Sequence, residues 1–285
     1  MDLDKIIQKI DLLSPVSVTG NRLMEIISNP NSSLTDIVDV IKYDQAMTAN
    51  LLKICNSSYY GLRTKVVSIK QAVAYLGINT IANAVMMGNF SKNFTAAQGG
   101  YDLDEGELWK YSVSSALIAK SLAEKRHLDN IPCLFTSALL KDIGKVILNT
   151  YIKDAFEKIV LSVQQDGLTF LEAEKKILGI DHAELGAMVA EKWRFSPEMV
   201  FIIRNHHDPL NILIGNDPSV SIIYLADTAC MMVGIGGGAD GLAYKYYQEV
   251  MDRLNFTNVD LQQTIADFWE KSKAVEELVN MSGGH

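Results

Sequence analysis

The fold is decided by residues 32–81, which read SSLTDIVDVIKYDQAMTANLLKICNSSYYGLRTKVVSIKQAVAYLGINTI. Ser33–Asp36 has the spacing of a capping box, in which the first side chain and the fourth residue satisfy each other's free backbone N–H groups. Ser68–Gln71 repeats this spacing, and Gly77 is the residue type that most often ends a helix. Apolar residues recur every three or four positions after each cap. The stretch therefore predicts several short helices in succession.

The same signals continue through the rest of the chain. Asp181–Glu184 has capping-box spacing, and Ser196–Pro197 places an N-cap before a proline at the first helical position. Glycine and proline together number 25 of 285 residues, below the roughly 12% of average usage. Strict two-residue alternation of apolar and polar residues is scarce. We therefore predict an all-α protein.

Two changes of composition suggest three parts. Residues 95–107 (TAAQGGYDLDEGE) are polar and glycine-containing, and residues 234–238 (GIGGG) are a glycine cluster. We predict an N-terminal helical lobe over 1–100, a helical bundle over 101–233, and two amphipathic C-terminal helices over 234–285 that pack on the core. No strand precedes the glycine cluster and no Lys-Ser/Thr follows it, which favours a flexible connector over a phosphate-binding loop.

Charge and cysteine content exclude several classes of protein. The chain carries 26 Lys and Arg against 34 Asp and Glu, a formal net charge of −8, which argues against general nucleic-acid binding. The three cysteines are dispersed in apolar surroundings and predict buried, reduced thiols. The N-terminus lacks the apolar run of a secretory signal, and the most apolar stretch, residues 220–235, is interrupted by Asp227. We expect a cytoplasmic protein without membrane association.

Five residues could carry chemistry at helix ends or within apolar helices: Asp142, His182, His206, His207 and Asp227. An aspartate on an apolar helix face is costly to bury without a partner. Histidines and carboxylates from several helices can build a divalent-cation site inside a bundle. The local pattern alone favours a simpler interpretation, in which the histidines stand at helix ends near the helix dipole.

The order of these motifs resembles the HDOD family, which is related to the metal-dependent HD phosphohydrolases. The resemblance runs from Leu12 to Asp227. It rests on the stretch quoted above, with its Asp44 helix start and its turn at 56–61. It also rests on LWKYSVSSALIAKSLA, LFTSALLKDIGKVIL, DHAELGAMVAEKW and NHHDP in the second half. It implies an N-terminal helical lobe followed by a degenerate HD-type bundle.

Two departures bear on function. Where active relatives have metal-ligating histidines, this chain has Tyr111 and Lys141. Tyrosine is a poor ligand at neutral pH, and lysine brings a positive charge where a cation would lie. The resemblance still matches Asp142, His182, His206, His207 and Asp227 to ligand positions. Two alternatives follow: Lys141 pairs with Asp142 or Asp227 in place of a metal, which we favour, or one divalent ion remains at Asp142, His182, His206 and His207.

Lys145 stands where relatives place a phosphate-facing lysine. It lies one helical turn from Lys141, so both ammonium groups could face one cavity and bind a phosphorylated ligand. The sequence modestly favours the simpler alternative of solvated surface lysines.

The resemblance implies an output or regulatory module in bacterial signal transduction that acts through contacts with signalling proteins. Tyr111 and Lys141 predict that it is non-catalytic, and the length outside the matched region predicts a stand-alone module. We expect no cofactor. The alternatives are a residual phosphohydrolase that uses one divalent metal ion on a nucleotide or cyclic dinucleotide, and a nucleotide sensor without turnover at Lys141 and Lys145.

Overall fold

The computed structural model describes residues 3–12, 18–27, 33–41, 44–210, 217–236, 238–239, 241 and 247–283. Across these residues the regular structure is helical, and the sole extended pairing is one bridge between Gln98 and Leu103. The all-α prediction is confirmed. No described helix is both long and apolar enough to cross a membrane.

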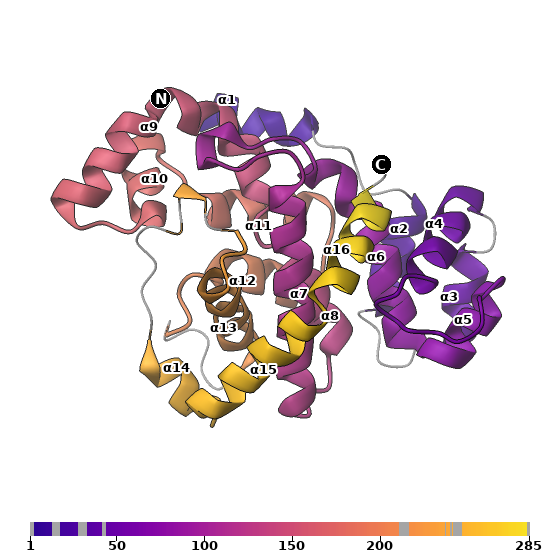
Figure 1. Cartoon of the computed structure of the whole chain (residues 1–285). Coiled ribbons are helices and arrows are strands. Elements are labelled where there is room, and N and C mark those ends of the chain that lie inside the picture. Colours follow the sequence, from indigo (N-terminus) through magenta and orange to yellow (C-terminus); the bar gives the residue numbers. More distant parts are fainter. Residues whose placement is uncertain are drawn as a thin grey trace.

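The described helices follow one another from indigo at the N-terminus to yellow at the C-terminus in Figure 1, and are taken below in three consecutive groups. The N-terminal group consists of α1 (Leu3–Gln8), η1 (Lys9–Leu12), α2 (Val18–Ile27), α3 (Leu34–Ile41), α4 (Gln45–Cys55), α5 (Ile69–Leu76) and α6 (Ile78–Phe94). The central group consists of η2 (Gly99–Tyr101), α7 (Glu107–Lys125), α8 (Ile131–Leu140), α9 (Ile143–Asp166), α10 (Phe170–Leu178), α11 (His182–Lys192), α12 (Pro197–Asn205) and α13 (Ser219–Met232). The C-terminal group consists of α14 (Gln248–Arg253), α15 (Asn258–Glu270) and α16 (Ser272–Gly283).

The helix ends confirm the predicted caps. Ser33 and Asp36 bond reciprocally, each accepting from the other's backbone N–H. Ser68 accepts from the backbone N–H of Gln71 at the start of α5. Gly77, at φ +78°, ends α5 and precedes α6, a backbone conformation that favours glycine. Short helices therefore begin and end where the sequence indicates.

The C-terminal segment departs from the prediction of two helices. The second predicted helix is split at Lys271, whose backbone N–H still bonds to Phe268, so that α15 and α16 are separate. Residues 244–246, at the start of the first predicted helix, lie outside the described residues. The last helix packs on the core: Trp109 Nε1 on α7 donates to Ser282 Oγ at 3.1 Å.

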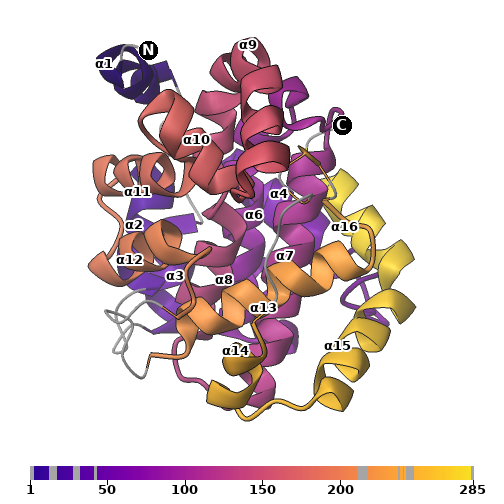
Figure 2. The ribbon, with the colours of Figure 1, turned by 90° about the vertical axis from the view of Figure 1, so that its left-hand side faces the viewer.

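Helix α7 runs through the middle of the bundle and packs against α8 and α13 (Figure 2). Helices α9 and α11 cross so closely that a Cβ on Gly144 would lie 2.0 Å from the carbonyl oxygen of His182. Only glycine permits this approach. The close crossing brings the start of α11 to the α8–α9 junction, where Lys141 and Asp142 lie.

The polar segment over 95–107 is packed against α9. The Gly100 N–H donates to Asn149 Oδ1 at 2.7 Å, and a Cβ at Gly100 would lie 2.2 Å from the Asn149 carbonyl oxygen. Tyr101 is fully buried. This segment therefore supplies core residues, while the division into 1–100, 101–233 and 234–285 stays a prediction.

Candidate functional site

The structure brings the eight predicted site residues into one connected cluster inside the bundle. They come from α7, the α8–α9 junction, α9, α11, the end of α12 and α13. The members are Tyr111, Lys141, Asp142, Lys145, His182, His206, His207 and Asp227. All are buried except His207, which is partly buried.

Lys141 lies between two carboxylates. Its Nζ forms an ion pair with Asp142 Oδ2 and lies 2.8 Å from Asp227 Oδ1, with the side chain fully buried. The Tyr111 hydroxyl donates to the same Asp227 oxygen. Burial alone would lower the pKa of Lys141, but the two aspartates outweigh it and the net shift is upward. The contacts expected of the salt-bridge alternative are therefore present, with both aspartates.

Lys145 is also buried, so its interpretation as a solvated surface residue is wrong. Its side chain is 2% exposed and its Nζ lies 2.8 Å from Asp142 Oδ1. The two lysines together hold both oxygens of Asp142. Burial would raise the pKa of Asp142, but Lys141 and Lys145 outweigh it and hold that pKa well below its usual value. Both ammonium groups therefore pair with Asp142, and Lys141 pairs with Asp227 as well, so two carboxylates balance the two cations.

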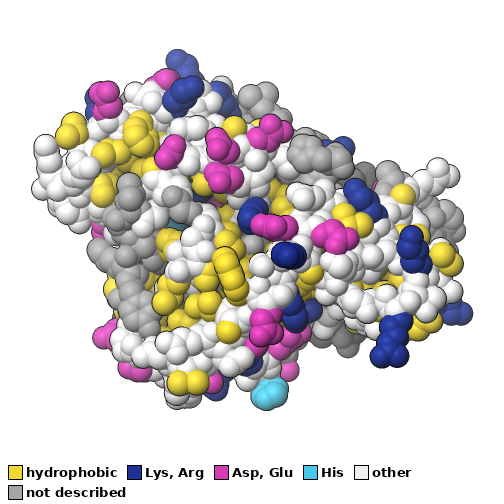
Figure 3. Space-filling model, viewed as in Figure 1, with side chains coloured by type: hydrophobic (Ala, Val, Ile, Leu, Met, Phe, Trp, Pro, Cys, Tyr) yellow, Lys and Arg dark blue, Asp and Glu magenta, His cyan; other side chains and the backbone are white. Residues whose placement is uncertain are grey.

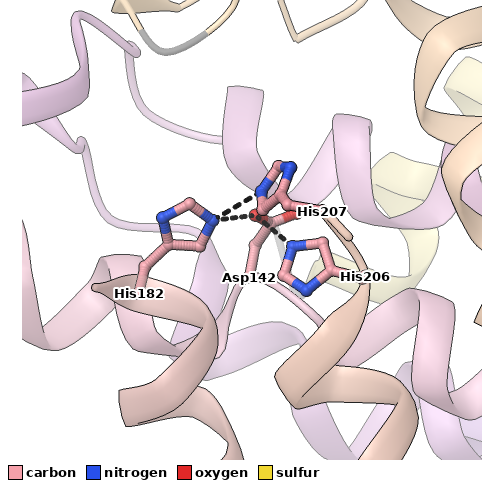
Figure 4. A group of neighbouring side chains, drawn as sticks. All are labelled: Asp142, His182, His206 and His207. Carbon is pink, nitrogen blue, oxygen red and sulfur yellow. Dashed lines mark hydrogen bonds and ion pairs between the residues drawn. The ribbon is translucent and has the colours of Figure 1, made fainter. Parts of the chain in front are cut away.

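The three histidines lie around Asp142 (Figure 4), and two of them approach Oδ1, the oxygen that Lys145 also binds. His182 Nε2 lies 3.7 Å from Asp142 Oδ1 and 2.9 Å from His207 Nε2. His206 Nδ1 lies 2.7 Å from the Ile203 carbonyl oxygen and must donate to it, because a carbonyl only accepts. In neutral His206 the Nε2 therefore carries a lone pair. It lies 4.0 Å from Asp142 Oδ1, fully buried and without a hydrogen-bond partner among the described residues.

Burial dominates the protonation of two of these histidines. It lowers the pKa of His206 to about 3, and it lowers that of His207 well below the usual value. His182 differs because it lies against a carboxylate. Burial opposes its charged form, but Glu174 outweighs burial and raises the pKa of His182.

Sequence reasoning missed Glu174 and Tyr101. Glu174 is fully buried on α10 and accepts from the backbone N–H of His182 at 2.9 Å, with His182 Nδ1 at 2.8 Å. The Tyr101 hydroxyl donates to its other oxygen at 2.7 Å. One signal was present: Glu174 lies four residues after Phe170 and four before Leu178, on the apolar face of the helix. No local pattern indicated Tyr101, which reaches the site only through the packing of 95–107 on α9.

The cluster fits one divalent cation better than two. Ligand atoms of Asp142, His182, His206 and His207 lie within 4.8 Å of one another. Glu174 and the Ile203 carbonyl oxygen fix the far nitrogens of two rings, as outer partners do for metal-ligating histidines. The position between Asp142 and Asp227 is filled by the ammonium group of Lys141, so a second cation does not fit there.

The glycine cluster covers the Tyr111 side of the site. Gly236 has φ +75°, and a Cβ there would lie 2.1 Å from the Tyr111 ring. A Cβ on Gly238 would lie 2.5 Å from the Tyr101 carbonyl oxygen. These glycines are required for close packing, in addition to the connecting role that the sequence predicted.

The amino-acid sequence of the chain matches one protein family and two curated proteins. A family model described as HDOD domain matches residues 13–209. An uncharacterized protein of Treponema pallidum is 26% identical over 230 residues, which cover 76% of this chain and 42% of that protein. The uncharacterized protein YuxH of Bacillus subtilis is 25% identical over 163 residues, 54% of this chain and 39% of its own length. The chain thus spans about two-fifths of these curated relatives.

Three solved structures share the fold. An HDOD domain protein of unknown function from Geobacter sulfurreducens has a TM-score of 0.75 at 22% identity, with 99% of both chains covered. A candidate phosphohydrolase from Shewanella amazonensis has a TM-score of 0.72 at 21% identity, with 97% of both chains covered. A candidate signal transduction protein from Marinobacter aquaeolei has a TM-score of 0.77 at 21% identity, covering 98% of this chain and 64% of that one. With the family model matching most of its length, this chain belongs to the HDOD family.

Proposed function

We propose that this chain is a non-catalytic regulatory domain of signal transduction that acts through contacts with other proteins. One observation carries the proposal: the Lys141 ammonium group is fully buried between Asp142 and Asp227. Two-metal phosphohydrolases activate the nucleophile and stabilise the leaving oxygen with separate ions. A chain that puts an ammonium group at one of the two ion positions loses that cooperation. The Marinobacter aquaeolei structure, whose name refers to signal transduction, is consistent with such a role.

Metal content and activity test the proposal together. We expect the protein purified without chelator or added metal to be folded and to contain well under one equivalent of transition metal. We also expect no metal-dependent hydrolysis of phosphodiesters. Phosphodiesterase activity in the native protein that is abolished by Asp142→Ala would overturn the proposal. The double variant Tyr111→His, Lys141→His restores both ligand types, and its gain of bound metal would show that these two residues exclude the ion.

The second candidate is a residual phosphohydrolase with one divalent ion. The Nε2 of His206, which has no hydrogen-bond partner among the described residues, favours it, because in the neutral ring this atom carries a lone pair 4.0 Å from Asp142 Oδ1. In neutral His182 the Nδ1 faces Glu174, so the Nε2 also carries a lone pair, which lies 2.9 Å from His207 Nε2. The ion would be held by Asp142, His182, His206 and His207, and would supply an acidified water molecule. It must compete with Lys145 for Asp142 Oδ1. This candidate predicts about one tightly bound equivalent of metal that is lost when His206 or His207 is replaced.

A nucleotide sensor at Lys141 and Lys145 has less support. Both ammonium groups are buried and bind Asp142, so a phosphate would have to displace the carboxylate. A ligand that binds only the native state raises its stability. A rise in melting temperature with added nucleotides, absent in Lys145→Gln, would favour this alternative.

A further inference from the structure

One part of the chain carries a charge opposite to the whole. Residues 44–94 contain five basic residues against the single acidic residue Asp44, a net charge of +4 in a chain of −8. All five basic side chains are exposed. They are Lys53, Arg63, Lys65, Lys70 and Lys92. Residues 44–94 thus present positive charge on an otherwise acidic protein.

The segment before α5 presents part of this charge outward. The Asn56 side-chain amide accepts from the Val66 N–H at 2.8 Å and donates to the Val66 carbonyl at 2.9 Å, as a neighbouring strand would. Val66 is buried, whereas Arg63, Lys65 and Val67 are exposed. Two cations and one apolar side chain therefore share the outer face of this segment.

Helix α5 continues this outer face. The Val67 N–H donates to Gln71 Oε1 at 3.0 Å, and Gln71 and Tyr75 lie one helical turn apart. The inner face of the helix consists of the buried Ile69, Ala72 and Val73. Val67 is 73% exposed and Tyr75 is 60% exposed. We call the combined outer face the α5 surface; its residues are Arg63, Lys65, Val67, Lys70, Gln71 and Tyr75.

The cations of the α5 surface are not neutralised by the chain itself. Among the described residues Arg63, Lys65 and Lys70 form no ion pair, whereas Lys110 pairs with Glu276 at 3.0 Å elsewhere on the molecule. Basic side chains gather at the end of the molecule that holds α3 to α5, on the right of Figure 3, and acidic ones lie mostly over the rest of that face. This surface is available to a partner of opposite charge.

We propose that the α5 surface binds an acidic segment of a partner protein that also carries apolar side chains. The proposal rests on the protein-binding function above and names the surface and the chemistry of its partner. Charge complementarity steers association, and the exposed Val67 and Tyr75 supply apolar contact. A nucleic acid is a poorer occupant, because three neighbouring cations neutralise few phosphates and the rest of the chain repels the others.

The probe is a fluorescein-labelled peptide rich in Glu with Leu and Phe anchors, and its matched form has Gln in place of Glu. We expect fluorescence anisotropy with the full chain to show binding of the Glu peptide that weakens at high salt. The variant Arg63→Glu, Lys65→Glu, Lys70→Glu should weaken binding about 10-fold or more. The control Lys153→Glu, Lys158→Glu, Lys273→Glu makes the same change in net charge at exposed positions elsewhere, and should change binding less than about 2-fold.

A second variant tests the apolar part of the surface without changing its charge. Val67→Ser with Tyr75→Ser keeps the charge and should weaken binding about 5-fold. Absence of binding, equal losses in the two charge-reversal variants, or equal binding of the Gln peptide would each overturn the proposal. Two further results would also overturn the proposed partner. Tighter binding of a single-stranded oligonucleotide would indicate a nucleic acid, and self-association in sedimentation that the Arg63→Glu, Lys65→Glu, Lys70→Glu variant abolishes would indicate a second copy of the chain. The metal and activity assays on native protein test the proposed non-catalytic function separately. That function and the proposed binding surface can therefore fail independently.

Discussion

The Tyr111 ring lies beneath the Lys141 ammonium group, with 4.2 Å from Nζ to the ring centre, and both side chains bind Asp227. The two residues that depart from the pattern of active relatives therefore act on one carboxylate. An ammonium group over an aromatic face gains further electrostatic attraction. Tyr111 and Lys141 thus contact each other as well as Asp227, and each stabilises the position of the other.

Removing the charge of Lys141 should destabilise the fold strongly. Lys141→Met keeps most of the side-chain volume but leaves Asp142 and Asp227 with less compensation in a buried site. We expect a loss of about 3–5 kcal/mol in the free energy of unfolding, measured by urea denaturation. The control Lys110→Met removes an exposed ion pair with Glu276, and should cost less than about 1 kcal/mol. Equal costs would contradict the structural role assigned to Lys141.

Stability should fall as the pH drops below about 6.5, the ordinary pKa of histidine. The pKa values of His206 and His207 are lowered in the fold, so the unfolded chain takes up protons there first. Each can contribute up to about 1.4 kcal/mol per pH unit. His182 has the opposite sign: its raised pKa stabilises the fold at low pH, and this contribution is lost as the pH rises through the folded value.

Urea midpoints across pH 5 to 8 would measure this dependence in the native protein. Two histidines with lowered pKa values outnumber one with a raised value, so the net slope below neutrality should be positive with pH. In His206→Asn the slope should become shallower, since one of the two groups is gone. An unchanged slope would show that His206 does not titrate as its buried position indicates.

Gly236→Ala should lower the free energy of unfolding more than Gly234→Ala does. Both positions have positive φ, +75° and +74°, so the backbone strain of the two variants is matched. A Cβ at Gly236 would overlap the Tyr111 ring, whereas a Cβ at Gly234 meets no atom within 4 Å. We expect Gly234→Ala to cost about 1 kcal/mol and Gly236→Ala to cost a further 1–3 kcal/mol. Thermal unfolding of the two variants checks this, and a difference near zero would contradict the close packing.

Glu174→Gln should lower the pKa of His182. The carboxylate that raises this pKa becomes a neutral amide, which keeps the side-chain shape. Titration of the histidine resonances by NMR gives the value directly. Glu157→Gln, at an exposed position on α9, is the matched control and should leave His182 unaffected. If the His182 pKa does not fall in Glu174→Gln, another group holds its proton.

The predictable parts of this molecule are those encoded locally. The caps at Ser33, Ser68 and Asp181 depend on residues three positions apart, and the structure confirms them. The His182, His206 and His207 cluster followed from family resemblance, which carries long-range information that the local pattern lacks. The same resemblance identified Tyr111 and Lys141 as residues that differ from the metal-ligating histidines of active relatives.

The features that the sequence did not predict depend on contacts between residues that are distant along the chain. The burial of Lys145 results from its pairing with Asp142 inside the bundle, and an isolated helix would leave such a lysine in water. Glu174 and Tyr101 meet at the site from segments 73 residues apart. The break at Lys271 separates two helices whose combined pattern is continuous in sequence.

The Lys141 ammonium group has a further consequence because it is covalently part of the chain. A metal ion between two carboxylates is in exchange with its surroundings, and its occupancy varies with supply and with chelators. A tethered cation has an effective concentration fixed by the chain, so it is present whenever the fold is present. At the position between Asp142 and Asp227 the positive charge is therefore inherited with the sequence, and under the proposed function this end of the site does not depend on the supply of metal.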